Sequence, residues 1–376
     1  MLSRKRVHVV CTTSDLRYDG RVFSMINTLA RSYPMDIVYI LELTSSDYVV
    51  ENLYDNVKYK RIGWLSRINT KSRLLRYISC LEYAIVTLGY MLLKSPKSIQ
   101  VHHEGVLLST ILYKKLFPKT ILVYDDKEFY NPKDKNIAKP IFLLEKKVIQ
   151  NCDLLIETNC YRKRAVNSTV CPLSDVIVVD NYVFGKGKCY LGDLLETIKD
   201  LKNRGQRIML HQGDLSDIRG TKQIYEIIES LQENWILLFI GLSRESFDAL
   251  HSRAAGNKER ILYGGYIPYQ ELNSFWSYMD AGVLFYDACS FNNKYCAPNR
   301  LYLAVNNGVP IIVNSDNYTL TRFLKEYRCG LSYPGSRLEC FYNSFAHFKQ
   351  NALSLKGRFV YDDYYIQDLA NFYVKK

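Results

Sequence analysis

The chain has 376 residues, of which 48% are hydrophobic and 23% are charged, values that are ordinary for a soluble globular enzyme of about two or three domains. This composition excludes disordered and low-complexity proteins. The net charge of +12 is concentrated in residues 1–183, which carry 27 Lys and Arg against 18 Asp and Glu. We therefore expect an anionic partner, such as a polyanion, a phosphate-bearing substrate or an anionic membrane surface.

Short apolar segments alternate with helical patterns in the first half of the chain. Residues 7–11 predict a strand, a polar loop and a helical pattern follow, and residues 35–40 predict a second strand. Further strands are predicted at residues 57–61, 98–101, 120–124 and 154–157. Buried strands that alternate with helices indicate a parallel sheet covered by helices on both faces.

Residues 67–97 predict a long apolar helix flanked by basic residues. Such a helix can cover a sheet with its ends in solvent, or it can lie on a membrane interface. We favour the covered helix.

The second half repeats the pattern. Strands are predicted at residues 207–211, 235–240, 260–263, 282–286 and 310–313, and helices follow Gly220 and cover residues 246–254, 269–278 and 299–306. A Gly- and Lys-rich segment at residues 184–191 marks the boundary. The predicted division is residues 1–183, residues 184–355 and a C-terminal helix within 356–376 that packs back on the first domain.

Ten scattered cysteines form no C-x-x-C pair, which predicts reduced thiols in the cytoplasm rather than disulfides or a zinc site. The N-terminus lacks the apolar core of a signal peptide, and no stretch is apolar enough to span a membrane. His102-His103-Glu104 is the best metal-binding candidate, but neighbouring strand residues point to opposite faces. We predict no metal site and no cofactor.

Charged residues follow two strands of the first half. Asp15, Asp19 and Arg21 lie in the loop after the first strand, and Asp126, Lys127 and Glu128 follow a later one. Carboxylates around one lysine suit acid and base chemistry, and crowded like charges should raise the pKa of one of them.

Two helix starts of the second half suit an anion. Gly213, Arg219 and Gly220 lie between a strand and a helix, and Asn299 and Arg300 open a helix after a proline. Free N–H groups and a guanidinium bind phosphate well, so the pair suggests a diphosphate ligand. The spacing of neither a P-loop nor a dinucleotide fingerprint is present.

An ordered series of weak motifs runs from about residue 7 to residue 335. The segments are 14–22 (D-x-x-x-D-x-R-V), 124–130, 145–157, 179–181, 211–220 (G followed by R-G), 263–272 and 298–310 (P-N-R-L … G-V-P). This order resembles that of glycosyltransferases of the GT-B fold, most of all family 4. The family's E-x7-E pair is replaced by Tyr295 and Leu303, its usual His by Lys127, and a frequent Arg by Asp214.

The resemblance implies an α/β chain with two Rossmann-like domains facing across a cleft. It implies transfer of a sugar, without a metal, from a nucleotide-diphosphate sugar to a glycan or a lipid-diphosphate-linked acceptor in cell-surface polysaccharide synthesis, with the enzyme cytoplasmic and peripheral on the inner membrane face. Implied donor-site residues are Gly213, Arg219, Gly220, Tyr266, Ile267, Asn299 and Arg300. Implied acceptor-side residues are Asp15, Arg21 and His103, and implied catalytic residues are Asp19, Asp126, Lys127 and Glu128.

Other functions remain open. A degenerate, non-catalytic scaffold is favoured by the missing E-x7-E pair. A non-hydrolysing sugar-nucleotide epimerase would need more acidic residues than residues 272–287 supply. A nucleic-acid binder is permitted by the charge, but no recognised motif supports it, and we expect no nucleic-acid partner.

Overall fold

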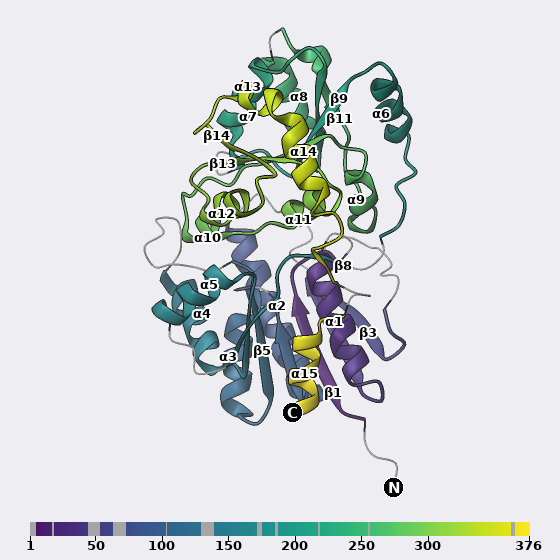
Figure 1. The fold of residues 1–376 in the computed structure, drawn as a ribbon. Coiled ribbons are helices and arrows are strands. Elements are labelled where there is room, and N and C mark those ends of the chain that lie inside the picture. Colours follow the sequence, from purple (N-terminus) through teal and green to yellow (C-terminus); the bar gives the residue numbers. More distant parts are fainter. Residues whose placement is uncertain are drawn as a thin grey trace. The chain divides into compact units, whose positions relative to one another are not determined.

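The computed structural model describes residues 5–16, 19–43, 53–62, 73–102, 104–128, 139–170, 175–184, 187–216, 219–254, 256–361 and 365–376. The chain forms two compact domains (Figure 1). The N-terminal domain comprises residues 1–180 and 362–376, and the C-terminal domain comprises residues 181–361. The predicted boundaries after residues 183 and 355 differ from these by three and six residues.

The N-terminal domain contains a sheet of seven parallel strands in the order β3-β2-β1-β4-β5-β6-β7. The strands are β1 Val7–Thr12, β2 Ile37–Leu43, β3 Val57–Ile62, β4 Ser98–Val101, β5 Ile121–Asp126, β6 Leu154–Glu157 and β7 Asp175–Val178. The chain order reverses beside β1, so the edge at the carboxyl ends of β1, β4 and β5 is where such sheets bind ligands. Strand β7 was not predicted, because it is a half-exposed edge strand that begins with a charged residue.

Helices connect these strands. They are α1 Gly20–Ser32, α2 Arg73–Lys94, η1 Glu104–Val106, α3 Leu107–Leu116, α4 Lys139–Asn151, α5 Cys160–Thr169 and, from the end of the chain, α15 Gln367–Lys375. Helix α15 packs against α1, where the Tyr33 hydroxyl donates to the carbonyl of Tyr373 at 2.6 Å. The predicted return of the C-terminal helix to the N-terminal domain is confirmed.

The C-terminal domain contains a sheet of six parallel strands in the order β11-β10-β9-β12-β13-β14. These are β9 Arg207–Gln212, β10 Trp235–Ile240, β11 Ile261–Tyr263, β12 Ala281–Leu284, β13 Ile311–Asn314 and β14 Gly330–Tyr333. Alternate residues of β9 enter two apolar clusters, Ile208 and Leu210 one and Met209 the other. A sheet buried on both faces explains the continuous apolar runs in the sequence.

The helices of this domain are α6 Leu194–Asn203, α7 Thr221–Glu229, α8 Arg244–Arg253, η3 Lys258–Arg260, α9 Tyr269–Trp276, α10 Phe291–Tyr295, α11 Asn299–Asn306, α12 Tyr318–Tyr327, α13 Leu338–Asn343 and α14 Phe345–Leu353. Strands β8 Val183–Phe184 and β15 Val360–Tyr361 pair in parallel. The C-terminal helix was predicted within residues 356–376, and Val360 and Tyr361 of that range form β15 instead.

Helix α2 covers the N-terminal sheet as expected, but only one of its two apolar faces is buried. Its inner face buries Tyr83, Ala84, Thr87 and Met91, as a helix on a sheet should. Its outer face is also apolar, and there Ile85 is 62% exposed. The sequence alone could not separate these faces, because both carry apolar residues.

Candidate functional site

At the carboxyl edge of the N-terminal sheet, a buried ion pair holds Arg21. The Arg21 Nη2 atom lies 2.7 Å from Asp125 Oδ1, and His102 Nδ1 lies 2.9 Å from the other oxygen of that carboxylate. Burial opposes ionisation of Asp125, but Arg21 and His102 outweigh it and keep the pKa of Asp125 below its ordinary value. Arg21, expected on the acceptor side, is therefore committed to a buried network.

A second buried network lies beside it at the ends of β5 and β6. Arg162 Nη2 lies 3.1 Å from Asp126 Oδ1, and Arg162 Nε lies 3.3 Å from Glu157 Oε2. Burial raises the pKa of Asp126, and burial together with the Asp126 charge raises the pKa of Glu157 well above its ordinary value. The expected pKa rise in this loop thus falls on a carboxyl group with no exposed surface.

The remaining charged residues of this edge are more accessible. Lys127 Nζ contacts a carboxylate oxygen of Asp19 and lies 3.2 Å from the Ser14 hydroxyl. The other Asp19 oxygen accepts the Val22 N–H at 3.0 Å and thereby caps α1. Glu128 is exposed and Asp15 is half-buried, while His103 lies outside the described residues.

At the carboxyl edge of the C-terminal sheet, Arg300 lies buried in the first turn of α11. Its Nη1 atom donates to the carbonyl of Gln212, and its Nε atom donates to the Tyr286 hydroxyl at 2.9 Å. Its Nη2 atom is buried without a hydrogen-bond partner in the described part of the chain. A Cβ atom on Gly213 would lie 3.6 Å from Arg300 Nη1, so the missing side chain leaves the backbone close to the guanidinium.

Tyr286 joins the two predicted anion-binding arginines. The guanidinium carbons of Arg219 and Arg300 lie 4.6 Å and 4.4 Å from the centre of its ring, a cation–π geometry. Gly220 precedes α7 with φ +72°, and a Cβ there would lie 2.5 Å from the Cβ of Phe285. Because Gly220 has no side chain, the start of α7 packs closely against Phe285, the residue before Tyr286.

The loops that contain Gly213, Gly241 and Gly265 contact one another at the same edge of the sheet. A Cβ on Gly241 would lie 3.2 Å from the backbone of Gly213, and the Gly241 N–H donates to the carbonyl of Gly265 at 2.7 Å. Tyr266 is exposed, whereas Ile267 is buried in the core. Loops that follow β9, β10 and β11 thus meet, which brings the backbone near Tyr266 to the same edge as Gly213.

No carboxylate lies within salt-bridge distance of Arg219 or Arg300 among the residues that the structure describes. Tyr295 and Leu303 stand at the positions that correspond to the E-x7-E pair of glycosyltransferase family 4. The ring of Tyr295 lies beside Tyr318, and Leu303 is buried. Burial, with Arg300 and Arg219 nearby, lowers the pKa of His211 to about 3. The edge is therefore rich in positive charge and keeps its histidine neutral.

Several residues of these networks were not predicted as functional, among them Tyr286, Gln212, Arg162 and Glu157. Tyr286 follows an apolar strand, and the 31 tyrosines of the chain gave no reason to single it out. Arg162 lies in a polar helix that reads as a solvated surface. Only the carboxyl-end position of the preceding strands could have pointed to these residues.

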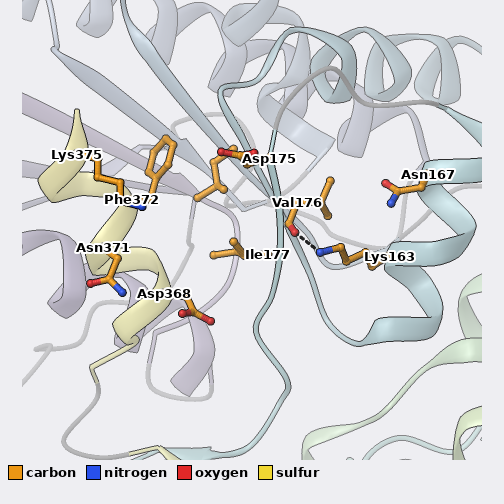
Figure 2. Close-up of a pocket in the computed structure, with 10 residues that line it drawn as sticks. Lys163, Asn167, Asp175, Val176, Ile177, Asp368, Asn371, Phe372 and Lys375 are labelled. Atoms are coloured by element: carbon orange, nitrogen blue, oxygen red, sulfur yellow. Dashed lines mark hydrogen bonds between the residues drawn. The ribbon is translucent and has the colours of Figure 1, made fainter.

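A groove of about 720 Å³ in the N-terminal domain is lined by none of the charged residues at the carboxyl edge of its sheet that are described above. Figure 2 shows it between α15, α5 and β7, with Lys163 donating to the carbonyl of Val176 at 2.5 Å. Its strand residues are Leu154 at the start of β6 and Asp175, Val176 and Ile177 of β7, so it lies along the outer strand of the sheet.

Within the segments that the structure describes, no group of three or more His, Cys, Asp and Glu side chains is placed to hold a metal ion. None of the described helices is both long and apolar enough to cross a bilayer.

No protein-family profile matches the sequence, and no curated protein sequence matches it. A sucrose-phosphate synthase from Thermosynechococcus elongatus superimposes with a TM-score of 0.70 at 12% identity, covering 98% of this chain and 97% of that one.

Two further solved structures are as similar. A trehalose-6-phosphate protein from E. coli bound with UDP-2-fluoro glucose gives 0.70 at 10% identity, with 99% and 97% of the two chains covered. Anabaena HepE in complex with UDP-glucose gives 0.68 at 10% identity, with 98% of each covered. The resemblance to family 4 in particular stays a prediction, but the two parallel-sheet, Rossmann-like domains have the GT-B fold.

Proposed function

We propose that the chain is a glycosyltransferase that binds the diphosphate of a nucleotide sugar at the carboxyl edge of its C-terminal sheet. The observation that carries this proposal is the buried Arg300 guanidinium, whose Nη2 atom has no partner in the described residues. An uncompensated buried cation is costly. A diphosphate would supply the missing charge and hydrogen-bond acceptors.

The surroundings of Arg300 support a diphosphate rather than a single carboxylate. Arg219 lies against the same tyrosine ring, and α7 and α11 both begin at this edge with free N–H groups. Gly213 lets a bulky ligand approach the backbone. Together these guanidinium and N–H groups would compensate the negative charge of two phosphates.

The reaction that follows is displacement at the anomeric carbon of the sugar. The bond from this carbon to the β-phosphate oxygen breaks, the nucleoside diphosphate leaves with the electron pair, and a bond forms to the acceptor oxygen. Arg219, Arg300 and the helix starts would stabilise the charge on the leaving diphosphate, so we propose that no metal is required. The acceptor proton passes to a carboxylate or to the leaving phosphate.

The N-terminal domain would bind the acceptor. Of the predicted catalytic residues, Glu128 is exposed, Asp19 and Lys127 are occupied with each other, and Asp126 is buried against Arg162. We propose Glu128 as the proton acceptor if the enzyme inverts. The basic N-terminal half suits a lipid-diphosphate-linked or glycan acceptor in cell-surface polysaccharide synthesis on the inner membrane face.

The donor we propose is a UDP-sugar, because two of the similar structures contain UDP-glucose or its 2-fluoro analogue. Calorimetric titration with UDP and UDP-glucose, with and without EDTA, tests this. Arg300→Met should weaken binding about 30-fold or more, since truncating one partner of a buried charge pair costs at least about 2 kcal/mol. Arg219→Met should weaken it less, because Arg219 is only half-buried.

Arg322→Met is the matched control. Arg322 is an exposed arginine of the same domain that also lies over a tyrosine ring, that of Tyr318. Unchanged affinity in both Arg300→Met and Arg219→Met would place the donor elsewhere. Loss of binding on metal removal would contradict the metal-independent mechanism.

A non-catalytic scaffold is the second candidate, favoured by Tyr295 and Leu303 at the two family glutamate positions. It predicts that UDP-glucose binds as above but that no glucose leaves UDP, either to water or to an acceptor extract, over many hours. Release of UDP that Arg300→Met abolishes would exclude it.

A further inference from the structure

Helix α2 is apolar on the side that faces away from the sheet. The side chains of Ile78, Leu81, Ile85 and Leu92 recur at helical spacing and are all exposed, and Leu93 beside them is 82% exposed. The opposite side of the helix is buried, so this helix is apolar around most of its circumference. A continuous exposed apolar stripe of this length is unusual unless something binds it.

Helix α3 extends the same surface. It packs against α2, and its exposed residues Leu108, Leu112 and Leu116 also follow one helical face. Leu116 is 63% exposed, and Phe117 after it is exposed as well. We call the exposed apolar residues of α2 and α3 the α2–α3 face.

Lysines border the α2–α3 face where α3 meets α4. A groove of about 370 Å³ between these helices is lined by Ile111, Lys115, Pro118 and Lys147, among others. Lys115 and Lys147 are exposed and have no ion-pair partner among the described residues. By contrast, the neighbouring Lys114 is paired with Asp153 at 2.8 Å.

We propose that the α2–α3 face docks on an anionic phospholipid bilayer. The leucines and isoleucines would enter the boundary between headgroups and acyl chains, and the lysines would contact lipid phosphates. The helices lie on the surface of the domain, and none of those described could span the bilayer. This assigns the membrane contact to named residues and does not depend on the nucleotide site.

Charge complementarity favours a bilayer over a second copy of this chain. Residues 73–122 carry seven Lys and Arg residues and two Glu residues. Two copies that met through this face would bring their lysines together, and like charges at an interface disfavour association. An anionic lipid surface attracts the same residues.

Vesicle sedimentation tests the proposal with the full chain and no nucleotide. The probes are phosphatidylcholine vesicles and phosphatidylcholine vesicles with about 30% phosphatidylglycerol. We expect binding to the anionic vesicles that falls as salt rises. Lys115→Glu/Lys147→Glu should lower the partition coefficient at least about 20-fold, at about fivefold per basic charge lost.

Apolar variants test the stripe itself. Leu81→Gln/Ile85→Gln and Leu112→Gln/Leu116→Gln should each lower the partition coefficient about tenfold or more, because their side chains leave the apolar boundary. The changed residues are on the surface, and the thermal unfolding temperature and UDP affinity show whether the fold is retained. Leu191→Gln and Lys258→Glu, on exposed residues of the C-terminal domain, are the matched controls and should bind as the unaltered chain does.

Three results would overturn the proposal. One is equal binding to neutral and anionic vesicles. Another is unchanged binding by both the Gln variants and the Glu variant. The third is a dimer in sedimentation velocity that Leu81→Gln/Ile85→Gln dissociates while no vesicle is bound, which would assign the face to a second copy.

Discussion

Buried arginines lie at the carboxyl edges of both sheets, but their hydrogen-bond partners differ in charge. In the N-terminal domain, Arg21 and Arg162 are buried against Asp125, Asp126 and Glu157. In the C-terminal domain, Arg300 is equally buried but is held by neutral oxygens of Gln212 and Tyr286. Arg300 is thus as buried as Arg21 and Arg162, but among the described residues only the two arginines of the N-terminal domain are neutralised by carboxylates.

This difference separates the structural cations from the cation that we propose to bind a ligand. The charge of a buried cation with a carboxylate partner is compensated, and removing the cation leaves an unpaired buried carboxylate. The charge of a buried cation with only neutral partners stays uncompensated until an anion binds. The C-terminal edge is therefore better suited to an anion than the N-terminal edge, although both carry arginines after parallel strands.

The largest effect is expected at Arg162. Arg162→Met should destabilise the N-terminal domain by about 3–5 kcal/mol, because Asp126 and Glu157 would lose their buried cation. Their folded-state pKa values lie above the ordinary values, so these groups stabilise the fold at low pH and lose that contribution as pH rises. The loss should accordingly be larger at pH 8 than at pH 5.

Urea unfolding followed by circular dichroism measures this change. Arg164→Met is the matched control, since Arg164 is exposed on the same helix α5. Equal stability of the two variants would mean that Arg162 does not compensate the carboxyl pair.

His211 should give the next largest effect. Its folded-state pKa of about 3 lies below the ordinary value of about 6.5. Its neutral form therefore stabilises the fold above pH 6.5, and this contribution is lost as pH falls, at about 1.4 kcal/mol per pH unit. Between pH 6.5 and 5 the chain should lose about 2 kcal/mol more stability than His211→Gln does.

Fluorescence of Trp235 and Trp276, both in the C-terminal domain, reports this unfolding. His347→Gln, on α14, serves as the control and should keep the pH dependence of the unaltered chain. Parallel stability curves for His211→Gln and the unaltered chain would show that burial and the two arginines do not hold His211 neutral.

Asp19 should show a smaller effect that divides into two parts. Asp19→Ala removes both the α1 cap and the contact with Lys127, and should cost about 1–2 kcal/mol. Asp19→Asn keeps the oxygen that accepts the Val22 N–H and should cost about half as much. If both substitutions leave stability unchanged but abolish transfer, Asp19 acts in catalysis rather than as a cap.

The smallest change in stability is expected at Arg300. Arg300→Met should alter the free energy of unfolding by no more than about 1 kcal/mol in either direction, because a buried cation is replaced by an apolar side chain. Chemical unfolding without nucleotide measures it, with Arg322→Met alongside. A loss as large as that in Arg162→Met would remove the distinction between the two edges.

Sequence patterns located many elements at their observed bounds. Residues 98–101, 154–157 and 235–240 form strands where the apolar runs predict them, and α11 spans the predicted residues 299–306 after its proline. Buried strands and capped helices carry their own local signal. The edge strands β7 and β14 and the β8–β15 pair lack that signal because distant residues decide their pairing.

The candidate site was predicted in part. Gly213, Arg219, Gly220 and Arg300 were selected from helix starts, and the structure brings them to one edge through Tyr286 and Gln212. Asp125, Asp126 and Glu128 are close in sequence but have different surroundings: Asp125 meets Arg21, Asp126 meets Arg162, and Glu128 is exposed. Neighbouring residues at a strand end point in opposite directions, so a sequence cluster need not be a cluster in space.

The sequence by itself determined two successive α/β domains with parallel sheets and phosphate-suited helix starts in the second, because apolar periodicity, glycine and helix caps act within a few residues. Only the tertiary structure decided which arginines are neutralised and which face of α2 is left bare. Charge compensation and exposure depend on groups brought from distant parts of the chain, such as Arg162 to Asp126 and Tyr286 to Arg300. No local pattern contains that information.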